Sequence, residues 1–137
     1  MERRTLLAAM TAALAGAGAA ATARAQAMPL VGFLFTESEA AATFRPRAFR
    51  SGLQEAGLVE GQTVAVDFRW ADGARERLPA LARALVERKA AVICAGNINA
   101  ALAARPVIGD TPLVFLTASD PVADGLVKSF NQPGGTA

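Results

Sequence analysis

The chain has 137 residues, which fits one domain, and 53% of them are hydrophobic. It contains no His and one Cys, which excludes His-dependent catalysis, a His-ligated metal site, an internal disulfide and a multi-Cys metal cluster. The formal net charge of +2 comes from the first 25 residues, so the remainder lacks the basic surface that a nucleic-acid partner requires.

Residues 1–25 have the three parts of a secretory leader. Arg3 and Arg4 supply a positive start, an uncharged Ala-rich stretch follows, and Ala23-Arg24-Ala25 fits a small-x-small cleavage site. The Ala-rich stretch is not hydrophobic enough to anchor stably in a membrane. We therefore expect a cleaved signal peptide over 1–25 and an exported chain over 26–137. Export by the general route and export by the twin-arginine route both remain open.

The first half of the mature chain predicts two strands and one helix. Residues 29–35 are continuously apolar, as in a strand that is covered on both faces. A helix is expected over 44–56, with Pro46 in its first turn and Gly57 as the left-handed residue that ends it. Residues 63–70 alternate between apolar and polar side chains, which favours a strand at the edge of a sheet.

The second half continues the alternation of strands and helices. Apolar residues at helical spacing predict a helix over 78–89, and residues 90–95 form a buried strand. A short Ala-rich helix is expected to end near Arg105, and a fourth strand covers 112–117. Asp120 and Pro121 resemble an N-cap and a first-turn proline. They predict a last helix over 122–130.

Four strand–helix units predict an α/β fold, with a parallel sheet flanked by helices on both faces. In such sheets ligands bind beyond the carboxyl ends of the strands. Polar residues that follow three of the strands could hydrogen-bond a small zwitterion, and helix N-termini favour its carboxylate. Each of these residues can also cap a helix or turn, and Asp120 fits a cap best. The candidate ligand-binding residues are Thr36, Ser38, Asn97, Asn99, Ser119 and Asp120.

Other residues with chemical potential have simpler interpretations. Cys94 is expected to be a small buried side chain, although with Asn97 it could form half of a two-cysteine racemase site. Trp70 and the Phe residues are expected to pack in the core or between lobes. Arg45 and its neighbouring arginines are expected to form a solvated helix face. No Gly-rich phosphate loop is present, so we expect no cofactor and no metal.

Several segments together resemble the periplasmic substrate-binding proteins of ABC transporters, in the branch that includes tryptophan- and tyrosine-binding members. The longest matching run is FRSGLQEAGLVEGQ at 49–62, and its part from Gly52 to Gln62 is quite specific in combination with the segment DPVADGLV at 120–127, which begins with Asp120 and Pro121. The other matching segments are MPLVGFL at 28–34, FRWA at 68–71, RLPALA at 77–82, PLVF at 112–115 and NQPGG at 131–135. The loop after the third strand departs from the family, which usually has Gly and Thr there.

The resemblance implies one lobe of a type I periplasmic-binding fold, which is Rossmann- or flavodoxin-like. Such a protein closes two lobes on a small, amino-acid-like ligand and delivers it to an ABC permease in the inner membrane. It acts as a monomer and performs no covalent chemistry, so we expect no enzyme activity. Residues 26–137 would form the N-terminal lobe, with the C-terminal lobe absent, as in a fragment. A non-functional truncated remnant and half of a Cys-dependent racemase-like enzyme are the alternative interpretations.

Overall fold

Four parallel strands form the centre of the computed structural model, which describes residues 28–135. The strand order is β2-β1-β3-β4, so the first strand lies inside the sheet, as its continuous apolar run predicts. The strands are β1 (Leu30–Phe35), β2 (Ala65–Trp70), β3 (Val92–Ala95) and β4 (Leu113–Phe115). The parallel α/β fold is therefore confirmed.

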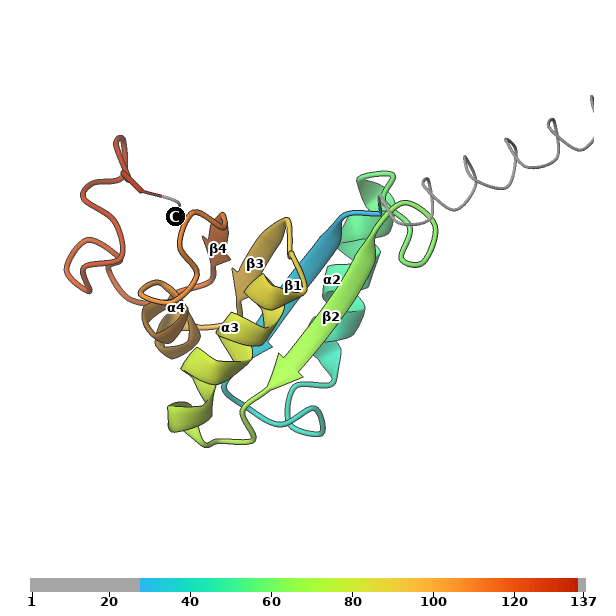
Figure 1. The fold of residues 1–137 in the computed structure, drawn as a ribbon, viewed down its shortest axis with the longest axis horizontal. Coiled ribbons are helices and arrows are strands. Elements are labelled where there is room, and N and C mark those ends of the chain that lie inside the picture. Colours follow the sequence, from blue (N-terminus) through green and yellow to red (C-terminus); the bar gives the residue numbers. More distant parts are fainter. Residues whose placement is uncertain (1–27, 136–137) are drawn as a thin grey trace, which may run out of the picture.

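Helices cover both faces of this sheet (Figure 1). On one face lies α2, and on the other lie α3 and α4. Pro46 lies in the first turn of α2, where its missing N–H costs no hydrogen bond. The helices are α2 (Phe44–Glu55), α3 (Leu78–Glu87) and α4 (Ile98–Ala104), with a short 3-10 turn, η1 (Arg75–Arg77), before α3.

The larger hydrophobic core lies between the sheet and the α3–α4 layer. Leu34, Leu85 and Ile93 are fully buried in it. Gly32 allows α3 to approach β1 closely, because a Cβ atom at this position would lie 2.8 Å from Leu85 Cδ1. The strong helical periodicity of 78–86 thus buries one face of α3 against the strands.

A second, aromatic core lies on the α2 side of the sheet. The Phe35 ring stacks between those of Phe33 and Trp70, at centroid distances of 4.3 and 4.2 Å. Phe49 of α2 meets Phe33 edge-on at 5.0 Å. Trp70 is therefore a packing residue, as the sequence predicts.

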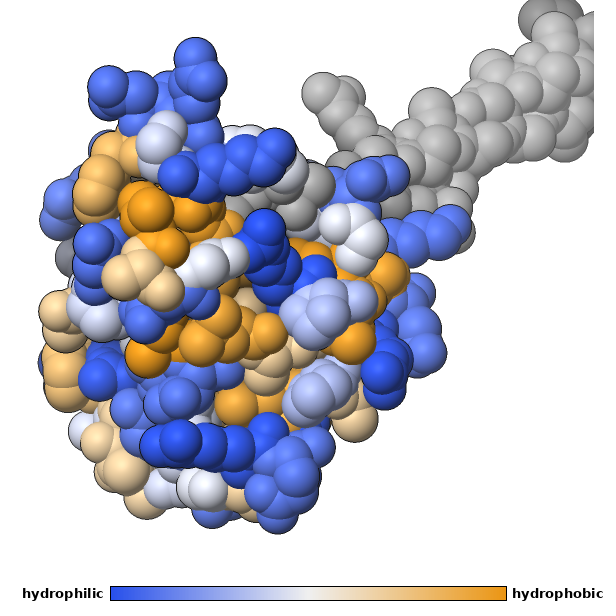
Figure 2. Space-filling model, turned by 90° about the vertical axis from the view of Figure 1, so that its left-hand side faces the viewer, coloured by the Kyte–Doolittle hydropathy of each residue, from blue (hydrophilic) through white to orange (hydrophobic). Residues whose placement is uncertain are grey.

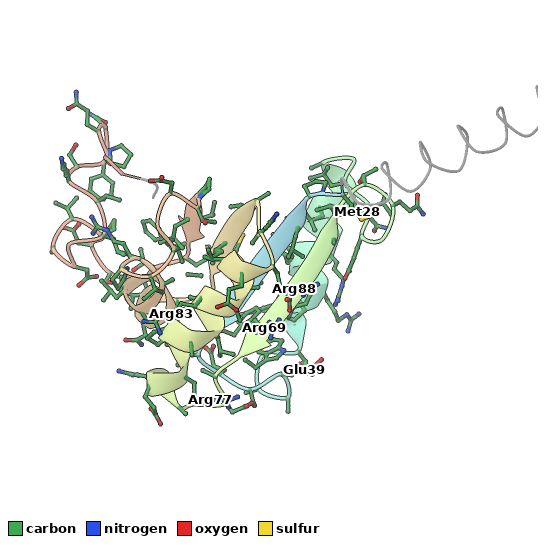
Figure 3. The ribbon with its side chains drawn as sticks, viewed as in Figure 1. Met28, Glu39, Arg69, Arg77, Arg83 and Arg88 are labelled. Carbon is green, nitrogen blue, oxygen red and sulfur yellow. The ribbon has the colours of Figure 1, made fainter. Side chains whose placement is uncertain are left out.

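The edge position predicted for the second strand is confirmed. β2 pairs with β1 alone within the described sheet, and all of its residues are partly exposed. Asp67 of β2 accepts a hydrogen bond from Arg69 at 2.9 Å and another from Arg88, which follows α3 (Figure 3). The hydrogen bond from Arg88 joins the edge strand to the end of α3.

The helix predicted over 122–130 does not form. Asp120 Oδ1 accepts the backbone N–H groups of Val122 and Ala123, so its capping role is present. The chain then turns away, because Gly125 has a left-handed backbone with φ +74°. Leu126 is fully buried and donates its N–H to the Pro121 carbonyl at 2.9 Å. The chain therefore makes a single turn after Asp120, which buries the Leu126 side chain, and does not continue as a helix.

The predicted signal peptide, residues 1–25, lies outside the described residues. From residue 28 to residue 135, none of the helices is long and apolar enough to span a membrane.

Candidate ligand-binding site

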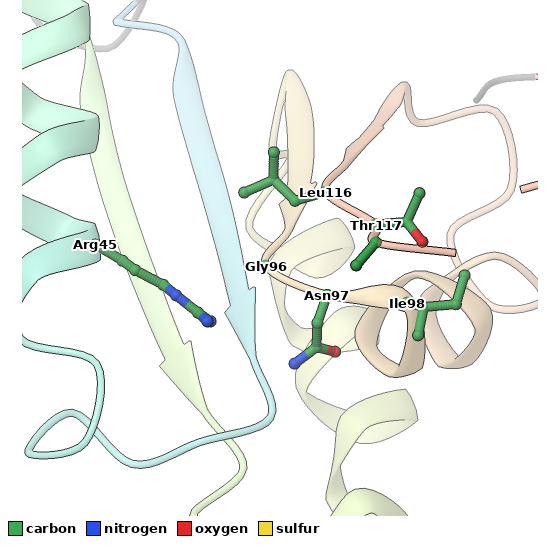
Figure 4. Close-up of a pocket in the computed structure, with 7 residues that line it drawn as sticks. Arg45, Gly96, Asn97, Ile98, Leu116 and Thr117 are labelled. Atoms are coloured by element: carbon green, nitrogen blue, oxygen red, sulfur yellow. The ribbon is translucent and has the colours of Figure 1, made fainter. Parts of the chain in front are cut away.

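A cavity of about 380 Å³ lies at the carboxyl ends of β3 and β4 (Figure 4). This is the edge at which the parallel topology predicts ligand binding. Side chains of both polar and apolar character reach it, together with the backbone of the β3–α4 turn. Its lining residues are Arg45, Gly96, Asn97, Ile98, Leu116, Thr117 and Ala118.

Asn97 connects two of the loops at this edge. Its Oδ1 accepts the Ala100 backbone N–H at 3.0 Å, which caps α4. The same oxygen accepts the Thr36 hydroxyl at 3.0 Å, across 61 positions of the sequence. With Oδ1 occupied twice, the Nδ2 group has no hydrogen-bond partner among residues 28–135. Asn97 thus combines the predicted capping role with a donor that lines the cavity.

The other predicted ligand residues lie outside the lining of this cavity. Ser38 Oγ accepts the Ala41 N–H at 3.3 Å within its own turn, and Asp120 caps the turn described above. Ser119 exchanges a hydrogen bond of 2.8 Å with Thr117, which does line the cavity. Asn99 is half-buried in α4. Their contact with a ligand stays a prediction.

Arg45 was expected on a solvated helix face, but it lines the cavity. Its guanidinium points from the first turn of α2 toward the β3–α4 turn (Figure 4). Nη1 lies 2.9 Å from Glu37 Oε1, and Cζ lies 5.8 Å from the centre of the Phe44 ring. One sequence signal could have indicated this position. The helix that follows β1 must begin at the carboxyl edge of the sheet, so a long side chain in its first turn reaches that edge.

An apolar cavity of about 290 Å³ adjoins the first one and shares Arg45 and Leu116 with it. It is walled mainly by α2 and β1, through Phe33, Phe44, Ala48 and Phe49. Leu116 and Val114 are more than half exposed, because α2 does not cover β4. Figure 2 shows the molecule from the β4 side, where apolar groups alternate with polar ones. The site therefore has a polar part and an apolar part that meet at Arg45.

Cys94 lies apart from the polar cavity, on the α2 side of β3. It lines a small apolar cavity with Phe33, Phe49 and Val114. Burial raises the pKa of its thiol to about 11, because a thiolate would be poorly solvated there. At neutral pH the group is a neutral thiol, which agrees with the expectation of a small apolar side chain. The racemase-like alternative requires a thiolate and is not favoured.

Comparison with known families identifies the chain. A family model described as "ABC transporter substrate binding protein" matches residues 35–137. The chain belongs to this family. The resemblance inferred from the sequence is thereby confirmed.

Individual relatives agree with this assignment. The tyrosine-binding protein of Clostridioides difficile is 32% identical over 89 residues, which are 65% of this chain and 26% of that protein. A ligand-free, open structure of a substrate-binding protein with adhesive properties from Clostridium difficile aligns with a TM-score of 0.71 at 26% identity. A domain in complex with L-Trp from Streptococcus pneumonia aligns with a TM-score of 0.71 at 23% identity and shows the fold alone.

Both structural alignments cover 80% of this chain and 37% of the solved chain. This chain therefore spans about a quarter of the curated relative and just over a third of the solved proteins. The names of two of these relatives describe a tyrosine-binding protein and a substrate-binding protein.

Proposed function

We propose that this chain captures a small, amino-acid-like solute in the periplasm for delivery to the permease of an ABC importer. The observation that carries the proposal is the cavity at the carboxyl edge of the sheet, where Asn97 and Arg45 supply N–H donors. A carboxylate needs such donors, and the adjoining apolar cavity suits an apolar side chain. An amino acid with an apolar side chain combines both features in one molecule.

The relatives support this ligand class. One is named for tyrosine binding, and a structural neighbour was solved with L-Trp. Both ligands have a zwitterionic head and an aromatic side chain. We place the head of the ligand near Asn97 and Thr36, with Ser38, Asn99, Ser119 and Asp120 as further contacts from the loops at the same edge.

We further propose that residues 26–137 are one lobe of a two-lobed, monomeric binding protein. The cavity is open to solvent, and a ligand held by one wall leaves much of its surface in water. A second lobe would supply the opposite wall. The matched region is 37% of each solved relative, which leaves room for such a lobe in those proteins. Binding then proceeds by closure, without covalent chemistry.

The test is a ligand screen on the protein expressed from its whole gene. Its melting temperature is measured with each of the twenty L-amino acids, and those that shift it are titrated by calorimetry. A ligand at 100 times its Kd stabilises the folded state by about 2.7 kcal/mol, which is readily detected. No shift and no binding heat with any of the twenty would contradict the proposed ligand class.

Matched threonine variants then locate the binding. Thr36→Val removes the hydroxyl that donates to Asn97, and we expect affinity to fall about 3- to 10-fold, as for one lost hydrogen bond. Thr111→Val is the control, because Thr111 lies before the start of β4, at the opposite edge of the sheet. Equal effects of both substitutions would place the ligand elsewhere.

A further inference from the structure

The guanidinium that lines the cavity is only partly paired. Arg45 Nη1 donates to Glu37 Oε1 at 2.9 Å, whereas its Nε and Nη2 have no hydrogen-bond partner in the part of the chain from 28 to 135. The side chain is one-third exposed. Because a guanidinium carries five N–H donors, Arg45 can donate hydrogen bonds to a second carboxylate while it keeps its bond to Glu37.

The ion pair of Arg45 with Glu37 uses fewer carboxylate oxygens than the ion pair of Arg50, which lies on the same helix. Arg50 contacts both carboxylate oxygens of Glu60. Glu37 uses one oxygen, and its Oε2 is buried without a partner among the described residues. A buried oxygen that lacks a hydrogen bond has lost its hydration without replacement. An incoming carboxylate would therefore compete with a one-sided pair.

The position of Arg45 between a polar and an apolar cavity indicates which other groups a ligand with such a carboxylate would have. Of the described residues that line the polar cavity and the adjoining apolar one, Arg45 alone is charged. Asn97 and Thr117 lie on its polar side, and Phe44 and Leu116 line the apolar cavity. An anionic group that leaves water for this site needs a positive partner, and neutral donors replace hydration less well.

We infer that Arg45 binds the carboxylate of the ligand and that Glu37 competes with the ligand for the same guanidinium. The inference rests on the proposed function and deepens it. The ligand is then an amino acid with a free carboxylate, whose apolar side chain lies against Phe44 and Leu116. Carboxamides and amines of the same shape are rejected, since they offer Arg45 no negative charge.

The experiment compares acids with their amides on the protein from the whole gene. L-tyrosine is paired with L-tyrosinamide and L-tryptophan with L-tryptophanamide, and every other amino acid that binds in the screen is paired with its own amide. Calorimetry gives the acid-to-amide affinity ratio for the wild type, Arg45→Gln and Arg45→Lys. Arg47→Gln is the matched control, because Arg47 is an exposed arginine of α2 that does not line the cavity.

We expect Arg45→Gln to lower the affinity for the acid about 10- to 100-fold, as for a lost charge-assisted hydrogen bond, and the affinity for the amide less than about 3-fold. Arg45→Lys keeps the charge but loses the forked geometry of the guanidinium, so its affinity for the acid should lie between those of the wild type and Arg45→Gln. Glu37→Gln removes the competing carboxylate and should raise the affinity for the acid more than that for the amide. Arg47→Gln should leave the ratio unchanged.

The experiment distinguishes a failure of the inference about Arg45 from a failure of the proposed function. If the wild type binds amino acids but Arg45→Gln and Arg45→Lys keep its acid-to-amide ratio, the inference about Arg45 is wrong and the proposed function stands. If Arg45→Gln does not fold, Arg45→Lys and Glu37→Gln decide by the same ratio. If the wild type binds no amino acid, the proposed ligand class fails and the inference fails with it.

Discussion

Gly96 joins the aromatic core to the wall of the cavity, so Gly96→Ala tests both. A Cβ atom at this position would lie 2.9 Å from Phe35 Cδ1 and 3.1 Å from Cε1, with Phe33 Cε1 at 3.3 Å. The Phe35 ring is fully buried and stacked on both sides, by Phe33 and Trp70. Both faces of the ring are occupied, so it cannot move away from position 96 without displacing a stacked neighbour.

The magnitude follows from these distances. Carbon atoms in contact settle at about 3.5–4.0 Å, so the ring and the new methyl group must separate by roughly 0.5–1 Å. Strain of this kind in a packed core costs about 1–3 kcal/mol. For a domain of this size, each kcal/mol lowers the melting temperature by about 4–8 °C.

The assay is urea unfolding followed by the fluorescence of Trp70, which is the single Trp of the chain and stacks on the ring that must move. Gly52→Ala is the matched control, because no atom lies within 4 Å of its Cβ position and Gly52 is inside α2. It should stabilise the protein by about 0.5–1 kcal/mol. A Gly96→Ala protein as stable as the wild type, or two shifts of the same sign, would refute the packing argument.

Two further predictions concern the thiol and the leader. Because burial raises the pKa of Cys94 to about 11, iodoacetamide should alkylate the folded protein slowly at pH 8 and faster as the pH rises toward that value. Unfolding in urea should remove the protection, and a rapid reaction of the folded protein at pH 8 would show that the thiol is accessible. For the leader, the intact mass of the product recovered from the periplasm should correspond to a chain that begins at Gln26. A product that retains Met1 would contradict cleavage.

The sequence predicted the architecture because its strongest signals are local. The continuous apolar run at 29–35 indicated an interior strand, and the alternation at 63–70 indicated an edge strand; both positions are observed. The spacing of Leu78, Leu81 and Leu85 predicted α3. Parallel order then followed from the alternation of strands and helices, because each crossover returns the chain to the same end of the sheet.

Local signals were misleading where tertiary burial competes with them. Asp120 and Pro121 have the pattern of a helix start, and Asp120 does cap the turn that follows. Helix formation requires several further residues at helical angles. Gly125 leaves that conformation, and Leu126 is buried in the core instead. The sequence contains both the cap and the glycine, but only the packed structure decides which prevails.

The candidate site also has features that the sequence predicted and features that only the tertiary structure shows. From the sequence alone, residues after β3 could be assigned to the carboxyl edge, and Asn97 lines the cavity there. Its hydrogen bond to Thr36 spans 61 positions, and the approach of Arg45 depends on where α2 begins beside the sheet. Such distances between elements are set by the packing of Phe33, Phe35 and Phe49. Residue type and order thus determined the sheet and the edge at which binding is proposed, whereas only the tertiary structure decided which side chains meet there.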